Sequence, residues 1–278
     1  MAELLVAARA GGYAVPSFCA WNAEVMEIVL RVAQDLRSPV IVMNGPGEFS
    51  LLVPALMGAV AHTVARGFTV PAALHLDHGD SMEMVQACLE AGYTSVMLDY
   101  SNRPFAENAG ALRQVVTLAH ALGVTVEGEL GHVGKVDTVT VEGTGDSTLT
   151  EPGEAAAYVE QTGVDALAVS IGNAHGQYTK LPKFDFARLE KIRAAVRLPL
   201  VLHGGSGTPP ADIQRAIALG MAKVNVATEI VATWRETLYG QWGAKQNLWA
   251  PQAMAEAKKA LVPVVQKWIR LTGAEGRA

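Results

Sequence analysis

Three histidines stand directly after short apolar runs, where they could share one metal ion. His78 lies in HLDHGD, His175 in GNAHGQY and His203 in VLHGGSG. Imidazole is a common zinc ligand, and a catalytic zinc site uses three protein ligands and keeps a fourth position open. A single histidine at such a place is more often a hydrogen-bonded core or loop residue. Three at equivalent positions, each beside Gly or Asp, favour a metal site.

Two carboxylates belong to the same candidate chemistry. Asp77 precedes His78, so its side chain is expected near the metal without having to bind it. There it could pass a proton to or from a substrate oxygen polarised by the metal. The alternative is a hydrogen bond that orients a ligand imidazole. Glu129, in the run EGELG, could be a further metal ligand or the partner of a buried cation.

Two later loops have the composition of a phosphate site. Residues 204–207 read GGSG, and residues 225–228 read NVAT at the start of a helical pattern. Glycine lets backbone N–H groups approach an anion closely, and a helix N-terminus adds positive potential. Together the two loops predict that the ligand carries a phosphate.

The elements that must position these groups are eight apolar runs bounded by Gly, Pro or Asp. They read as strands at about 13–18, 39–43, 72–76, 94–98, 124–129, 165–171, 199–203 and 222–226. Helical patterns lie between them, so the α/β chain is predicted to be a (β/α)₈ TIM barrel, with extra helices at its C-terminal end. A doubly wound sheet would need a glycine-rich dinucleotide turn after an early strand, and the sequence has none.

In such a barrel the carboxyl ends of all strands meet at one rim, which brings the three histidines together. Local signals also place two helix starts. Asp80 is predicted to cap the helix that ends at Gly92, and Thr208 to cap a helix whose first residue is Pro209.

The last fifty or so residues carry four tryptophans, and their role stays open. They could pack against the barrel or form a subunit interface. We expect a homodimer or a homotetramer. The tryptophans are Trp234, Trp242, Trp249 and Trp268.

Composition excludes several classes of protein. The 278 residues, half of them hydrophobic, suit a single domain spanning 1–278. With net charge −5 and no dense run of Lys or Arg, nucleic acid is not expected as a partner. Apolar stretches such as 51–61 are too short for a bilayer, so no membrane partner is expected. Glu3 stands where a secretory signal would be basic, which favours a cytoplasmic location.

Six motifs in order resemble the class II, metal-dependent ketose-bisphosphate aldolases of the fructose- and tagatose-bisphosphate branch. The resemblance runs from YAVPSF near the N-terminus to the closing GAEGRA, through HLDHGD, TSVMLDYS, EGELG, GNAHGQYTK, VLHGGSGTP and KVNVATE. It implies a lyase of carbohydrate metabolism, as in glycolysis. The implied reaction is reversible cleavage of a phosphorylated ketose to dihydroxyacetone phosphate and an aldehyde.

The resemblance also implies roles for individual residues. Zinc would be bound by the three histidines, Glu129 and Asp99 would serve a second or displaced metal, and Asp77 would give a proton to the aldehyde oxygen. A monovalent cation near the phosphate is a further expectation. The positions that would hold the phosphate of dihydroxyacetone phosphate are Gly176, Lys180, Gly204, Ser206, Asn225 and Thr228.

The irregular segment 131–151 contains several glycines and is predicted to be a mobile loop over the active site. In it, Asp137 stands where the family has a suspected glutamate base, and it could remove a proton from the carbon that forms the new bond. The alternative is a solvated loop acid, with Glu142 as the next candidate for the base.

Several positions depart from the family pattern, and most lie in the half of the site that would hold the aldehyde. The dihydroxyacetone-phosphate half matches the family, so the identity of the aldehyde stays open. Lys258 is matched to a residue that contacts the distal phosphate. The other departures are Cys19, Tyr100, Asn102, Lys135 and Asp137.

Two other functions compete with a zinc aldolase. The protein could be a catalytically silent barrel that acts as a binding or assembly subunit. The departures from the family pattern at 100, 102 and 137 are the reason to consider this function. An aldolase that forms a Schiff base would need a desolvated lysine in the barrel mouth, such as Lys223. The intact Asp77 and the three histidines argue against both.

Overall fold

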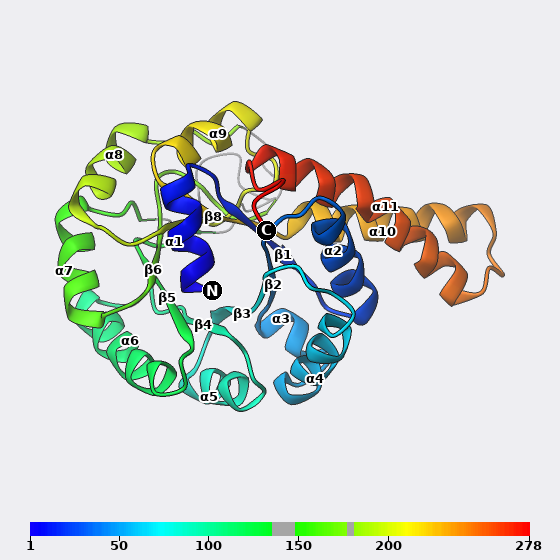
Figure 1. Ribbon diagram of the computed structural model, residues 1–278, viewed down its shortest axis with the longest axis horizontal. Helices are drawn as coiled ribbons and strands as arrows, with labels where there is room; N and C mark the ends of the chain where they lie inside the picture. Colours follow the sequence, from blue (N-terminus) through cyan, green and yellow to red (C-terminus); the bar gives the residue numbers. More distant parts are fainter. Residues whose placement is uncertain (135–147, 177–180) are drawn as a thin grey trace.

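Eight parallel strands close into a barrel in the computed structural model, which describes residues 1–134, 148–176 and 181–278 (Figure 1). Each strand pairs with the next along the chain, and the eighth pairs with the first. The strands are β1 (Val15–Cys19), β2 (Val40–Asn44), β3 (Ala72–Gly79), β4 (Ser95–Leu98), β5 (Thr125–Leu130), β6 (Ala166–Val169), β7 (Leu200–Leu202) and β8 (Met221–Val226).

The predicted (β/α)₈ fold is confirmed, because each of the eight predicted runs overlaps one observed strand. Parallel strands covered by helices are buried on both faces, so they appear in sequence as continuous apolar runs rather than as alternating patterns. β2 shows this directly, since all five of its residues are buried.

Helices surround the barrel, and α1 crosses its amino-terminal end near the starts of the strands (Figure 1). The backbone N–H of Ala2 there donates to the Thr125 hydroxyl at the start of β5. The helices are α1 (Ala2–Gly11), α2 (Ala23–Asp35), α3 (Pro46–Phe49), α4 (Pro54–Ala65), α5 (Met82–Glu90), α6 (Phe105–His120), α7 (Pro152–Thr162), α8 (Phe186–Ala195), α9 (Pro210–Ala218), α10 (Thr228–Ala244) and α11 (Ala250–Leu271).

Both predicted helix caps are wrong by one residue. Ser81, not Asp80, caps α5, and its hydroxyl accepts from the Met84 N–H at 3.3 Å. The N-cap of α9 is Pro209, because the hydroxyl of Thr208 is directed to the Gly204 carbonyl at 3.4 Å. Neighbouring residues can compete for one cap, and the path of the loop decides between them.

An irregularity in β3 sets the direction of two site residues. Its register with β4 shifts between Leu76 and Gly79, and His78 has a left-handed φ of 49°. In a regular strand, side chains alternate between the two faces, whereas a bulge re-aims one of them. The consecutive residues Asp77 and His78 can therefore both face the carboxyl end of the barrel.

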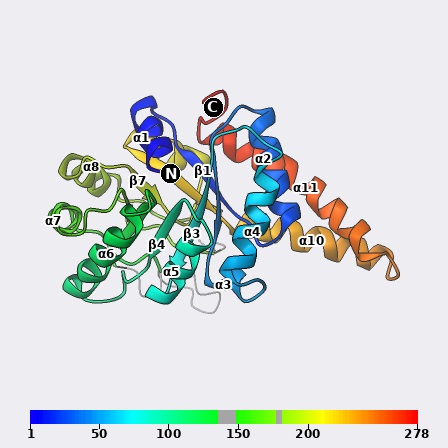
Figure 2. The ribbon, with the colours of Figure 1, turned by 60° about the horizontal axis from the view of Figure 1, so that its bottom comes forward.

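Helices α10 and α11 pack against each other and project from the barrel as an arm (Figures 1 and 2). Trp268 and Trp234 are buried, so for them the packing interpretation is confirmed. Trp249, just before α11, is 71% exposed, and a subunit interface there stays a prediction. Among the described helices, none has an apolar stretch long enough to cross a bilayer.

We predict that Gly45→Ala destabilises the fold, because a Cβ on Gly45 would lie 2.3 Å from the backbone oxygen of Asp77. Overpacking of this kind costs about 1–3 kcal/mol in the free energy of unfolding. Gly110→Ala is the matched control, because a Cβ there meets nothing within 4 Å and replaces a glycine inside α6. Urea denaturation should show a lower midpoint for Gly45→Ala alone. Equal midpoints for the two variants would contradict this account.

Candidate active site

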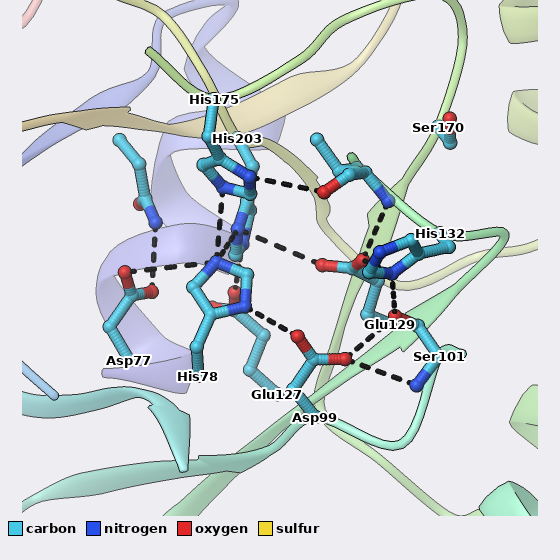
Figure 3. Close-up of polar contacts among 12 residues, drawn as sticks. Asp77, His78, Asp99, Ser101, Glu127, Glu129, His132, Ser170, His175 and His203 are labelled. Atoms are coloured by element: carbon cyan, nitrogen blue, oxygen red, sulfur yellow. Dashed lines mark hydrogen bonds and ion pairs between the residues drawn. The ribbon is translucent and has the colours of Figure 1, made fainter. Parts of the chain in front are cut away.

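Three imidazole rings meet above the carboxyl ends of β3, β6 and β7 (Figure 3). Nε2 of His78 lies 3.1 Å from Nε2 of His175 and 2.7 Å from Nδ1 of His203. Nitrogens bound to one tetrahedral zinc at 2.0–2.1 Å are about 3.3 Å apart. The spacing of the three nitrogens is therefore close to that of a shared metal ion.

The second nitrogen of each ring is held by an acceptor. His78 Nδ1 donates to Asp99 at 2.7 Å, and His175 Nδ1 donates to the Val133 carbonyl at 3.1 Å. His203 Nε2 donates to Glu127 at 2.9 Å. Such outer hydrogen bonds fix the tautomer and the orientation of metal-binding histidines. They leave the other nitrogen of each ring directed to the common centre, which is the arrangement that a shared metal ion requires.

The charges around the rings differ between the histidines. Burial works to lower the pKa of His78, but Asp77, the hydrogen bond to Asp99 and Glu129 outweigh it and raise this pKa to about 10. Burial, together with the neighbouring His78 and His203, lowers the pKa of His175 to about 3. Near neutral pH the cluster therefore holds a proton on His78, and a bound cation would replace that proton.

Asp99 and Glu129 lie beside His78 on the side of β4 and β5 (Figure 3). One Asp99 oxygen accepts from His78, while the other accepts from the N–H and the hydroxyl of Ser101. Oε1 of Glu129 accepts from the Val133 N–H, whereas its buried Oε2 has no hydrogen-bond partner and lies 3.7 Å from His203 Nδ1. An unpartnered buried carboxylate oxygen suits a further metal ligand.

Glu127 is the site residue that the sequence reasoning missed. It is fully buried, and its two oxygens contact Lys223 Nζ at 2.9 and 3.2 Å while Oε1 also accepts from His203. Burial alone would raise its pKa, but Lys223 and the nearby histidines lower it to about 2. Residues two apart on a strand share a face, so the spacing of Glu127 and Glu129 in EGELG was an available signal.

The same contact determines what Lys223 can do. Its ammonium is fully buried and engaged by both oxygens of Glu127, and it lies 3.9 Å from Asp77 Oδ1. A Schiff-base lysine needs a free amine in reach of the substrate. Because Lys223 is held in an ion pair with Glu127, its role is structural and it does not fit the role of a Schiff-base lysine.

Asp77 lies next to the three nitrogens. Its Oδ1 accepts from Asn225 Nδ2 at 2.8 Å, and its Oδ2 lies 4.0 Å from His78 Nε2. Burial acts to raise the pKa of Asp77, but His78 and the neighbouring His75, His203 and Lys223 hold it well below its usual range. Asp77 is thus an ionised carboxylate beside the metal-binding nitrogens, in a position to exchange a proton with a substrate oxygen.

Three of the six predicted phosphate residues line a common cavity. Gly176, Ser206 and Thr228 line one cavity of about 840 Å³ that extends to Trp268. Gly204 has a left-handed φ of 69°, and a Cβ there would lie 2.0 Å from the Ala174 oxygen. Only glycine fits this close approach of the two loops.

Some predicted residues lie outside the described part of the chain. These are Lys180, Asp137, Lys135 and Glu142, so their predicted roles stay predictions. Of the other departures, Tyr100 packs against the barrel, with the Arg103 guanidinium 3.9 Å above its ring. Lys258 forms an ion pair with Glu27 on α2.

Comparison with known proteins agrees with this geometry. The family model described as fructose-bisphosphate aldolase class-II matches residues 1–277. The YdjI aldolase from Escherichia coli K12 is similar at 35% identity and a TM-score of 0.88, over 100% of this chain and 98% of the other. A putative fructose-1,6-bisphosphate aldolase from Coccidioides immitis has 29% identity and a TM-score of 0.90, over 99% and 96%.

A fructose-bisphosphate aldolase from Campylobacter jejuni shares the fold, with a TM-score of 0.84 at 20% identity over 99% and 95% of the two chains. The chain belongs to the class II fructose-bisphosphate aldolase family and is a lyase.

The proton on His78 gives a testable linkage. Because the pKa of His78 is raised to about 10, this imidazole is protonated near neutral pH and must lose its proton to bind a metal. We predict release of about one proton per zinc ion bound and an affinity that rises with pH. Calorimetric titration in two buffers of different ionisation enthalpy measures the release. His120→Gln, which alters an exposed pair with Asp165, should leave the release unchanged. A binding heat that is independent of the buffer would contradict the linkage.

Proposed function

We propose that the protein is a zinc-dependent ketose-phosphate aldolase that reversibly cleaves its substrate to dihydroxyacetone phosphate and an aldehyde. The observation that carries the proposal is the convergence of three imidazole nitrogens whose outer nitrogens are all held by acceptors. Zinc suits this set because imidazole is one of its preferred ligands. Membership of the class II family supports the reaction type.

Zinc bound there would act as a Lewis acid and stabilise the negative charge that develops beside the substrate carbonyl when the carbon–carbon bond breaks. The protein's own part is to orient the three imidazoles. Asp99, Glu127 and the Val133 carbonyl do this through the outer nitrogens. Glu129 is the candidate for an additional ligand, and Asp99 is proposed mainly as the support of His78.

Asp77 would handle the proton of the reacting hydroxyl. In cleavage, its ionised carboxylate accepts that proton as the hydroxyl carbon becomes an aldehyde, and in synthesis it returns the proton to the aldehyde oxygen. The hydrogen bond from Asn225 fixes the direction of the carboxylate. A position 4.0 Å from His78 Nε2 keeps Asp77 near the metal-binding centre without making it a ligand.

The phosphate of dihydroxyacetone phosphate would bind where β7 and β8 end. The N-terminus of α10 lies there, with the Glu229 N–H on the Ser206 hydroxyl at 3.2 Å and Thr228 at the first helical position. Backbone N–H groups and the helix dipole favour an anion at such a place. Lys180 is proposed to add its positive charge to this phosphate site. A monovalent cation near the phosphate stays a prediction.

Asp137 is proposed as the base that deprotonates bound dihydroxyacetone phosphate.

Metal removal tests the proposal against its alternatives. We expect chelation to abolish aldol cleavage and added zinc to restore it. Borohydride added with substrate should trap no adduct on Lys223, because its ammonium is paired with Glu127. Hydrogen exchange at the reacting carbon of dihydroxyacetone phosphate needs no aldehyde and should also require zinc. Absence of exchange in the zinc-loaded protein would favour the catalytically silent barrel, and full activity in metal-free protein would rule out the zinc mechanism.

The role of Asp77 can be separated from metal binding. Asp77→Asn should lower kcat about 10²–10⁴-fold, the usual contribution of general acid–base catalysis, while zinc content stays near that of the wild type. Asp80→Asn is the matched control, because Asp80 is exposed and only accepts from Ser81. Measuring kcat and bound zinc on the same preparations distinguishes a proton-transfer role of Asp77 from a role in metal binding. Parallel loss of both would make Asp77 a support of the metal site.

A further inference from the structure

The part of the rim formed by the loops after β1, β2 and β3 carries no basic residue. These loops are residues 20–22, 45–53 and 80–81, all within the described chain, and none of their residues is Lys or Arg. Two carboxylates lie near the Cys19 thiol at this β1–β3 rim, Asp77 at the end of β3 and Glu48 on the short helix α3. A substrate that reaches this part of the site therefore meets negative charge.

Glu48 is fixed in place at this rim. Its Oε2 accepts from the Gly45 N–H at 2.8 Å, and its Oε1 accepts from Cys19 Sγ at 3.2 Å. A carboxylate has about four acceptor positions, so each oxygen can still accept from a substrate hydroxyl. Glu48 is only partly buried, which leaves room for that contact.

Glu48 and Asp77 both raise the pKa of the Cys19 thiol. Burial raises the pKa of Cys19 well above its usual value, and Glu48 and then Asp77 add to the effect. The thiol therefore stays a hydrogen-bond donor to Glu48. Gly45 lies between Glu48 and the backbone of Asp77, because a Cβ on it would lie 2.3 Å from the backbone oxygen of Asp77 and 3.9 Å from Glu48 Oε2.

Three cationic side chains in the described part of the chain are paired with carboxylates. Lys223 is bound by Glu127 beneath the site, and Lys258, the residue matched to a distal-phosphate contact, forms an ion pair with Glu27. Arg31 also pairs with Glu27. Each of these three side chains already has a carboxylate partner.

The reacting aldehyde must lie on this side. The phosphate of the other product is placed at the ends of β7 and β8, and Asp77 must touch the aldehyde oxygen. The hydrogen bond from Asn225 turns the Asp77 carboxylate toward β8 and its neighbour β1. The aldehyde chain then continues from Asp77 over the ends of β1 and β2, where Cys19 and Glu48 stand.

We propose that Glu48 is a specificity residue that selects an uncharged, hydroxyl-bearing aldehyde and disfavours a phosphorylated one. The ketose substrate would then carry phosphate only at the dihydroxyacetone end. A hydroxyl of the aldehyde donates to Glu48, whereas a phosphate of nearly two negative charges is repelled by Glu48 and Asp77. This inference rests on the proposed aldolase function and narrows its substrate class.

The test is aldol synthesis from dihydroxyacetone phosphate with either D-glyceraldehyde or D-glyceraldehyde 3-phosphate. These aldehydes differ only in the phosphate, and consumption of dihydroxyacetone phosphate is counted whichever configuration forms at the new centre. For the wild-type zinc enzyme we expect kcat/KM to favour D-glyceraldehyde by about tenfold or more. Glu48→Gln keeps the shape and removes the charge, and it should raise kcat/KM for the phosphorylated aldehyde about tenfold.

Glu83→Gln is the matched control, because it removes one exposed carboxylate in the first turn of α5 and should leave the preference unchanged. Zinc content and hydrogen exchange of dihydroxyacetone phosphate report whether each variant is folded and competent. A wild-type preference for the phosphorylated aldehyde, no consumption of D-glyceraldehyde, or an unchanged ratio in a competent Glu48→Gln variant would overturn the inference. Absence of exchange in the wild type would instead remove the proposed aldolase function itself.

Discussion

A buried carboxylate inside the barrel is the constraint on which the site depends. Glu127 is shared between Lys223 on β8 and His203 directly after β7, and all three side chains are removed from solvent. An uncompensated ion in such a place costs several kcal/mol, so neither Glu127 nor Lys223 is tolerated alone. The Glu127–Lys223 pair fixes the tautomer of His203. The orientation of His78 and His175 can serve a shared metal ion only if Nδ1 of His203 is also in place.

The barrel then supplies the geometry that such a cluster needs. Closure brings β3, β6 and β7 to one rim, and the irregular register of β3 lets Asp77 and His78 both face it. The strained backbone of His78 is held by hydrogen bonds on either side of its ring. Local strain of this kind persists where the surrounding structure determines it, and here it places Asp77, the proposed proton-transfer group, beside the three imidazole nitrogens.

The two halves of the rim differ in how they present charge. At the ends of β7 and β8, glycine and a helix N-terminus offer backbone N–H groups to an anion. At the ends of β1 to β3, Glu48 and Asp77 offer acceptors, and Lys223 and Lys258 are paired with carboxylates. This asymmetry is the basis of the proposed division of the rim between an anchor for dihydroxyacetone phosphate and a site for the aldehyde.

The sequence by itself determined the eight strands, the barrel and the three histidines, because strands buried on both faces leave continuous apolar runs and the histidines follow them directly. The sequence could not show that Glu127 accepts a hydrogen bond from His203 or that Lys223 forms an ion pair with Glu127. It also could not show that Ser81 rather than Asp80 caps α5. The hydrogen bond from Cys19 to Glu48 could not be predicted from the sequence either. Periodicity follows from burial along one strand, whereas these partners come from different strands and loops, so only closure of the barrel decides which groups meet.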